Sequence, residues 1–273
     1  MSGRKWINTN SFKNFKEKEV GNGYFRVMIN KGDFEGMLVK KDNSKKLFVV
    51  LSGSWDSEKH KWPYFQHLNW QHKLDGHILY LADPTLLFAK DLRIGWYVGT
   101  AQFDWATEMS KLVKHIAQAL AVETNNISPI GEASGGFASL MLASKLNGST
   151  AIAINPQTEV LSYHKRFVVD FLEKCFDGVI ASRVPVEIKS RLSATQVYQE
   201  NIFAKAVILQ NKQSVHHYTK HFLPFCERLD LPKEGGLDST GRIQTILCDE
   251  EQTRFDIAAM LPILQQRAEA YSN

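Results

Sequence analysis

The stretch Asn126-Ile-Ser-Pro-Ile-Gly-Glu-Ala-Ser-Gly-Gly-Phe137 decides the fold. A short apolar run precedes Gly131-Glu-Ala-Ser-Gly-Gly136, and apolar residues at helical spacing follow it. Small residues around a serine, between a strand and a helix, are typical of the sharp turn that holds a nucleophilic serine at the start of a helix. The segment therefore predicts a strand, turn and helix of an α/β protein, with Ser134 as the candidate nucleophile.

Strand and helix patterns alternate on both sides of this unit. Continuous apolar runs predict buried strands at 46–51, 77–82, 150–154, 205–209 and 242–247. Helical spacing predicts helices at 105–120, 137–146, 216–229 and 254–271. Pro262 either kinks the last of these helices or begins its second half. Strands joined by helices form a mostly parallel sheet that is covered on both faces, so we expect a three-layer α/β sandwich.

The N-terminal part departs from this alternation. Residues 24–29 and 34–39 are rich in strand-forming residues and flank Asn30-Lys-Gly-Asp33, which predicts an antiparallel hairpin. Residues 1–20 are expected to form a polar lead-in, and 160–200 a helical insert of mixed polarity. At 273 residues the chain has the length of a single α/β domain, which we assign to 1–273.

Charge and cysteine content exclude several classes of function. The net charge of +4, from 33 Lys and Arg against 29 Asp and Glu, is too small to indicate a nucleic acid or an anionic membrane as partner. No apolar run reaches the ~20 residues of a membrane span, and the N-terminus lacks a signal-peptide pattern, so a cytoplasmic protein is expected. Cys175, Cys226 and Cys248 are too far apart to indicate a disulfide framework or a zinc site.

The segment around Ser134 also has an ordinary structural interpretation. Serine is a preferred helix cap, and paired glycines occur in many turns. The pattern departs from the usual one as well, because Glu132 occupies the position two residues before the serine and Gly131 lies one position too early. We expect Glu132 either to pair with a cation or to orient a histidine at the pocket floor, or else to lie at a solvent-facing rim.

Gly131-Glu-Ala-Ser-Gly-Gly136, followed by Ala153-Ile-Asn-Pro-Gln157, resembles the turn and the next strand end of α/β-hydrolase-fold proteins from bacterial surface-polysaccharide loci. That group includes capsule O-acetyltransferases and esterases with a Ser-Asp-His triad. The resemblance covers 46–160 and 205–225 through short motifs. It implies an α/β-hydrolase-type fold and acyl transfer to or from a sugar hydroxyl.

The resemblance carries family roles onto some positions and not onto others. Ser134 matches the nucleophile; the backbone N–H of Gly135, with Ser54 or Trp55, would form the oxyanion hole. Ser214 stands where the family has its acid, and no histidine follows His221. His217 is then the preferred base, with His216, His221 or His164 as alternatives. The carboxylates Asp249, Glu250 or Glu251 could orient it.

Other features near these positions have two interpretations. The cluster His216, His217 and His221 is either part of the site or a half-buried helix face, and we predict no metal there. Aromatic residues follow two strands and either contact a sugar or close the core, with Trp55 and Trp96 as the candidates for ligand contact.

Two functions remain open. The first is a serine-dependent esterase or O-acyltransferase that acts on a carbohydrate. Its catalytic residues would be Ser134, His217 and Glu132, and its substrate would contact Trp96, His216 and His221. The second is a catalytically silent relative that binds a glycan or a partner protein in polysaccharide assembly. No cofactor is expected, since an acyl donor such as acetyl-CoA would be a substrate; the oligomeric state, including a homo-oligomer, stays open.

Overall fold

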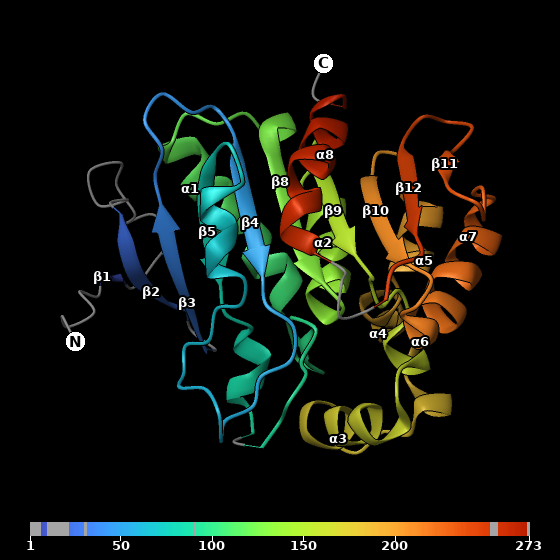
Figure 1. The fold of residues 1–273 in the computed structure, drawn as a ribbon. Coiled ribbons are helices and arrows are strands. Elements are labelled where there is room, and N and C mark those ends of the chain that lie inside the picture. Colours follow the sequence, from blue (N-terminus) through green and yellow to red (C-terminus); the bar gives the residue numbers. More distant parts are fainter. Residues whose placement is uncertain (1–6, 10–21, 30–31, 90, 252–255, 272–273) are drawn as a thin grey trace.

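A mostly parallel sheet forms the centre of the protein (Figure 1). The computed structural model describes residues 7–9, 22–29, 32–89, 91–251 and 256–271. Among these, ten strands form one sheet in the order β1-β2-β3-β5-β4-β8-β9-β10-β12-β11. Its central part is a run of neighbouring parallel strands: β4 (Leu47–Leu51), β5 (His77–Leu81), β8 (Ile127–Glu132), β9 (Thr150–Ile154), β10 (Lys205–Asn211) and β12 (Ile243–Cys248). The predicted α/β sandwich is therefore confirmed.

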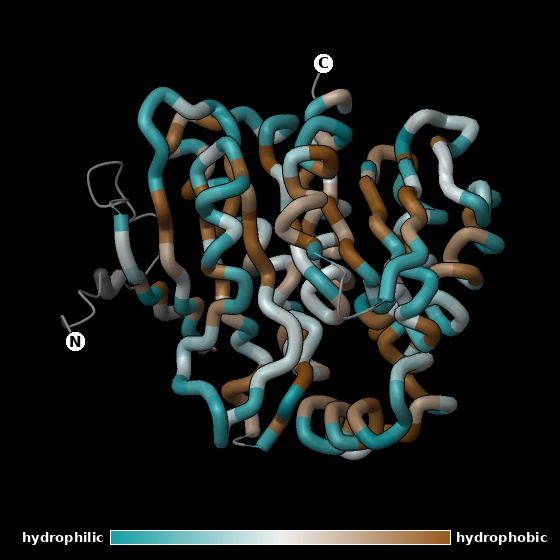
Figure 2. The backbone as a smooth tube through the Cα atoms, in the orientation of Figure 1, coloured by the Kyte–Doolittle hydropathy of each residue, from teal (hydrophilic) through white to brown (hydrophobic). Residues whose placement is uncertain are grey.

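The parallel strands are buried because both faces of the sheet are covered. Every residue of β4, β5 and β9 is buried. Successive side chains point to opposite faces, so Val49 packs with helix α1 (Trp105–Ala119) while Val50 packs with α8 (Ile257–Glu269). Continuous apolar runs are what such doubly covered strands require. Figure 2 shows hydrophobic residues concentrated along these strands.

The predicted hairpin is present at one edge. β2 (Gly23–Ile29) pairs antiparallel with β3 (Gly32–Val39), and β3 pairs antiparallel with β5. β1 (Ile7–Thr9) pairs in parallel with β2, so part of the predicted polar lead-in belongs to the sheet, and the rest lies outside the described residues. At the other edge β11 (Gly236–Leu237) pairs antiparallel with β12.

Helices cover the sheet and the carboxyl ends of its strands. α2 (Ser134–Ser144) lies beside α1, and α8 lies on the opposite face, in front in Figure 1. α8 continues through Pro262 rather than starting there. The insert predicted at 160–200 contains α3 (Lys165–Cys175), α4 (Val186–Leu192) and α5 (Ala194–Glu200), with α3 beyond the strand ends.

The helix predicted over 216–229 is built in three parts. α6 (Val215–His217) leads into a π-helical turn, Tyr218–Phe222, and then into α7 (Leu223–Leu229). Short elements complete the fold: a small hairpin of β6 (Gly99–Thr100) and β7 (Phe103–Asp104), and 3₁₀ turns at Leu68–His72, Pro84–Leu87, Thr124–Asn126, Val160–Ser162 and Ala181–Arg183. Within the part of the chain that is described, no helix combines the length and apolar character needed to cross a membrane.

Candidate functional site

The sharp turn between β8 and α2 is centred on Ala133, one residue before the predicted position. Ala133 has φ 52° and ψ −112°, a conformation that non-glycine residues rarely adopt, whereas Ser134 is already the first residue of α2. The prediction that Ser134 occupies the strained position is therefore wrong. In this turn the strained residue is the one that carries the nucleophile in a G-x-S-x-G motif, and here its side chain is a methyl group.

Two glycines fix this register. A Cβ on Gly131 would lie 2.4 Å from the carbonyl carbon of Gly135, and a Cβ on Gly135 would lie 2.3 Å from the carbonyl oxygen of Leu51. Both positions therefore require glycine, and they stand two residues before and two residues after Ala133. Gly131 is consequently the first glycine of the motif, and Glu132 does not replace it. This symmetric spacing was the sequence signal that could have identified Ala133.

The turn is tied to the end of β9 by backbone hydrogen bonds. The N–H of Ala133 donates to the carbonyl of Ile154 at 3.0 Å, and the carbonyl of Ala133 accepts from the N–H of Gln157 at 3.1 Å. Ser134 is only 3% exposed, and its hydroxyl lies against Gly53 in the loop after β4. The structure thus brings the turn, the loop after β4 and the segment after β9 together at one edge of the sheet.

Two backbone donors of the loop after β4 form hydrogen bonds within the protein. The N–H of Gly53 donates to Oε1 of Gln66 at 2.6 Å, and the N–H of Trp55 donates to the carbonyl of Arg93 at 2.8 Å. Trp55 is therefore not available as the second oxyanion donor, which corrects that prediction. Gln66 also donates through Nε2 to the carbonyl of Ser54 at 3.3 Å, so its amide holds Gly53 and Ser54 in place from one side.

The other predicted oxyanion donor shifts with the turn. In this motif the N–H of the residue after the nucleophile is the donor. Because Ala133 occupies the nucleophile position, that residue is Ser134 and not Gly135. Ser54 remains beside the site, with its side chain exposed toward a cavity described below.

His217 is held by neutral partners. Its Nδ1 lies 3.0 Å from the hydroxyl of Ser214, and its Nε2 lies 3.5 Å from Nε2 of Gln157. Asp249, proposed to orient it, instead accepts a hydrogen bond from Gln213 at 2.6 Å. Burial, reinforced by His216 and His164, lowers the pKa of His217 to about 4, so the ring is neutral at physiological pH.

The neighbouring histidines form one aromatic cluster with Tyr163. His221 is fully buried and its Nδ1 accepts from the N–H of Thr158 at 3.3 Å, while burial lowers its pKa to about 3. The π-helical turn places His216, His217 and His221 with ring centres 5.5–6.0 Å apart, and His216 stacks on His164 at 4.0 Å. No described group of three or more His, Cys, Asp or Glu side chains is arranged to hold a metal ion.

Glu132 contacts a histidine that the sequence did not single out. Its Oε2 lies 3.6 Å from Nε2 of His67, whose ring stacks on Trp70 with centres 4.0 Å apart. Burial raises the pKa of Glu132, opposed by a hydrogen bond with Asn155, and burial lowers the pKa of His67 to about 4. Because a pKa of about 4 leaves the His67 ring uncharged at neutral pH, the contact is not an ion pair there.

Trp96 does not lie at the mouth of the site. It is 1% exposed, its indole N–H donates to Oε1 of Gln157, and its ring packs against Phe171 with centres 5.1 Å apart. The core interpretation of this residue is therefore the correct one. Trp55 is also largely buried, but it contributes to the wall of a cavity above the loop after β4.

That cavity has a volume of about 380 Å³. It lies between the loop after β4 and the insert, and it combines aromatic rings with polar groups. His60 and Tyr64 stack on each other in its wall, with ring centres 4.3 Å apart. The lining residues include Ser54, Trp55, His60, Tyr64, Gln66, Arg93, Tyr163 and Phe167.

Comparison with known proteins supports the fold alone. No family model and no curated protein matches the chain. Among solved structures, a capsule O-acetyltransferase of Neisseria meningitidis serogroup A has a TM-score of 0.61 at 13% identity, covering 96% of this chain and 99% of that one. An S-formylglutathione hydrolase from Agrobacterium tumefaciens has a TM-score of 0.59 at 15% identity, over 92% and 94%.

A third similar structure is a longer protein. The Glycosylation Associate Protein (Gap123) complex from Streptococcus agalactiae has a TM-score of 0.62 at 12% identity, and the match covers 89% of this chain. This chain spans only 45% of the length of that one. These neighbours share the α/β-hydrolase fold, and the expected fold type is thereby confirmed.

Proposed function

We propose that this α/β-hydrolase-fold protein binds a carbohydrate and does not catalyse acyl transfer through the turn after β8. The observation that carries the proposal is Ala133, with φ 52° and ψ −112°, at the position where this turn presents a nucleophile. A methyl group cannot attack a carbonyl carbon. Because triad members act as a unit, losing one typically lowers the rate by ~10⁴-fold or more.

Ser134 as the nucleophile stays a prediction, which this geometry does not favour. The residue begins α2 with a helical backbone, so its side chain leaves the turn in a different direction from that of Ala133. The hydrogen-bond partners of His217 are Ser214 and Gln157 rather than Ser134. Two backbone N–H groups after β4, those of Gly53 and Trp55, already donate hydrogen bonds within the protein.

The cavity above the loop after β4 supports a sugar as the ligand. Aromatic rings such as Tyr64 and Tyr163 offer flat faces for the C–H groups of a sugar ring, and Ser54, Gln66 and Arg93 offer hydrogen-bonding groups for its hydroxyls. The similar structures include proteins named for capsule acetylation and for glycosylation. A place in polysaccharide assembly is consistent with both names.

The enzyme alternative is tested with p-nitrophenyl acetate and a fluorophosphonate probe. We expect equal hydrolysis and equal labelling in the wild type and in Ser134→Ala, because the serine does not occupy the turn. A loss of both signals in Ser134→Ala would overturn the proposal in favour of a serine hydrolase.

Carbohydrate binding is tested by saturation-transfer NMR and calorimetric titration with a panel of neutral and acidic oligosaccharides. For a sugar that binds, Tyr64→Ala should weaken binding about tenfold, the effect of losing one stacking contact of ~1.4 kcal/mol. Phe203→Ala serves as the control, because Phe203 is 64% exposed and does not line this cavity. Absence of binding to every sugar, or equal binding in both variants, would contradict a carbohydrate site in this cavity.

A further inference from the structure

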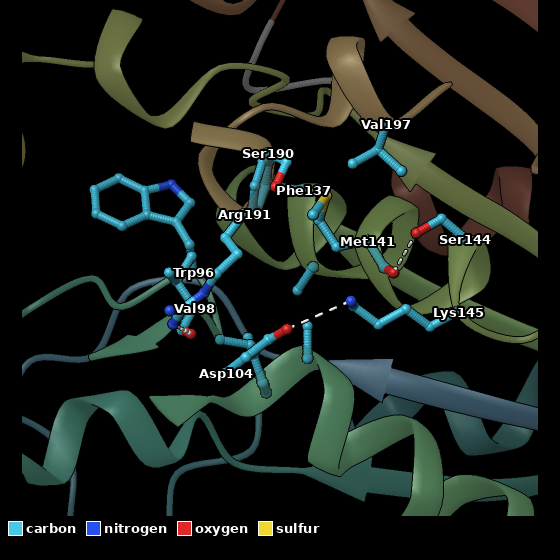
Figure 3. A pocket seen from close by; sticks show the side chains of 13 residues that line it. Trp96, Val98, Asp104, Phe137, Met141, Ser144, Lys145, Ser190, Arg191 and Val197 are labelled. Atoms are coloured by element: carbon cyan, nitrogen blue, oxygen red, sulfur yellow. Dashed lines mark hydrogen bonds and ion pairs between the residues drawn. The ribbon is translucent and has the colours of Figure 1, made fainter. Parts of the chain in front are cut away.

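A second cavity lies beneath α2, apart from the one above the loop after β4 (Figure 3). Its volume is about 200 Å³, and it shares no lining residue with the first cavity. Its apolar wall comes from Phe137 and Met141 of α2, with Trp96, Val98 and Val197 around them. A cavity of 150 Å³ with such walls holds a benzene ring, so this one has room for a six-membered ring with one small substituent.

One end of this cavity is charged. Lys145 lies 3.4 Å from Asp104, which also caps α1 by accepting from the N–H of Thr107 at 3.2 Å (Figure 3). Arg191 lines the same end. The two cations face one carboxylate, so the polar end of the cavity carries one positive charge in excess.

Arg191 is fixed there by the small hairpin. One terminal nitrogen of its guanidinium donates to the carbonyls of Val98, Thr100 and Phe103 at 2.7–2.8 Å. Its Nε is buried and has no hydrogen-bond partner among the described residues. The hydrogen bonds to the three carbonyls hold the guanidinium in place, and its positive charge lies beside the cavity that the residue lines.

We propose that this cavity binds a small monocarboxylate with an apolar body, of the size of benzoate. The apolar wall excludes strongly hydrated ligands, and the single excess charge fits a monoanion rather than a dianion such as phosphate. The carboxylate would lie toward Arg191 and Lys145, and the ring would lie against Phe137 and Met141. The proposal does not depend on a sugar site in the first cavity.

The probes are benzoate and its neutral isostere benzamide, measured by calorimetric titration on the full chain. Benzoate should bind with saturation at about 1 mM or below, within the affinity open to nine heavy atoms, and benzamide at least tenfold more weakly. Equal affinities for the two probes would overturn the proposal. So would a benzoate titration that is still unsaturated at about 10 mM, tenfold above the expected limit.

Charge variants with opposite effects sharpen the test. Lys145→Gln removes the excess charge and should weaken benzoate about tenfold, whereas Asp104→Asn raises it and should tighten benzoate severalfold. Lys145 and Asp104 are both partly exposed, so folded proteins are expected. Lys111→Gln on the outer face of α1 is the matched control, since Lys111 pairs with Glu108 away from the cavity. If Lys145→Gln binds benzoate as Lys111→Gln does, the proposal is wrong.

Discussion

Replacing Ala133 by glycine should stabilise the protein, although alanine-to-glycine changes usually do the opposite. Ala133 is held at φ 52° and ψ −112° by backbone hydrogen bonds to Ile154 and Gln157. A non-glycine residue in such a region costs of order 1–3 kcal/mol. Glycine adopts this conformation without steric conflict.

The net effect follows from three contributions. Relief of strain gains roughly 2 kcal/mol, the extra freedom of glycine in the unfolded chain costs about 0.5–1 kcal/mol, and loss of a half-buried methyl group costs about 0.4 kcal/mol. The free energy of unfolding should therefore rise by about 1 kcal/mol in Ala133→Gly.

Urea unfolding, followed by tryptophan fluorescence, measures this difference through the transition midpoint at constant slope. The control is Ala259→Gly, because Ala259 is exposed in the first turn of α8 and has no positive φ. It should lose about 1 kcal/mol from the lower helix propensity of glycine. If both variants lose stability by the same amount, the strain assigned to Ala133 does not exist.

Two further predictions concern the same region. Gly135→Ala should lower the free energy of unfolding by about 2 kcal/mol or more, because its Cβ would lie 2.3 Å from the carbonyl oxygen of Leu51. The control Gly178→Ala, at φ 73° with open space around it, should lower it by about 1 kcal/mol. Thermal unfolding measures both, and equal losses of stability would contradict the close approach at Gly135. The buried rings of His217 and His221 have pKa values of about 4 and 3, below the ordinary 6.5. As the pH drops, the unfolded chain therefore takes up protons before the folded chain does. The free energy of unfolding should fall as the pH drops from 6.5 toward 4. In His221→Gln this decline should be shallower in urea titrations across that range, and an unchanged pH profile would show that His221 does not resist protonation.

The strands and main helices were predictable because their apolar patterns follow from two-sided burial. The runs 46–51 and 205–209 are β4 and β10, two strands whose interiors are buried. The helical spacing of 105–120 is that of α1, whose apolar stripe faces β4 and β5. These features depend on local sequence and on a hydrophobic environment common to all such folds.

The details of the site were less predictable, because they depend on contacts distant in sequence. The pairing of Gln66 with Gly53 joins two ends of a loop, and that of Glu132 with His67 joins β8 to that loop. The burial of Trp96 depends on Gln157 and on α3. No pattern of residue types marks the π-helical turn around His221. The sequence therefore shows how far apart the histidines lie along the chain, but it does not show which side chains they contact.

The error at Ala133 has a different origin, because the necessary signal was in the sequence. Ser134 is the serine among these glycines, but the residue at the strained position of the turn is Ala133, which lies two positions from both Gly131 and Gly135. Those glycines are required because a Cβ on either one would lie only 2.3–2.4 Å from backbone atoms of Gly135 or Leu51, whatever side chain stands at the turn. A strained turn therefore needs no catalytic role to persist, since it is what lets α2 pack directly against the sheet. Retention of the turn in this chain is evidence for the fold, and only the side chain at position 133 bears on the chemistry.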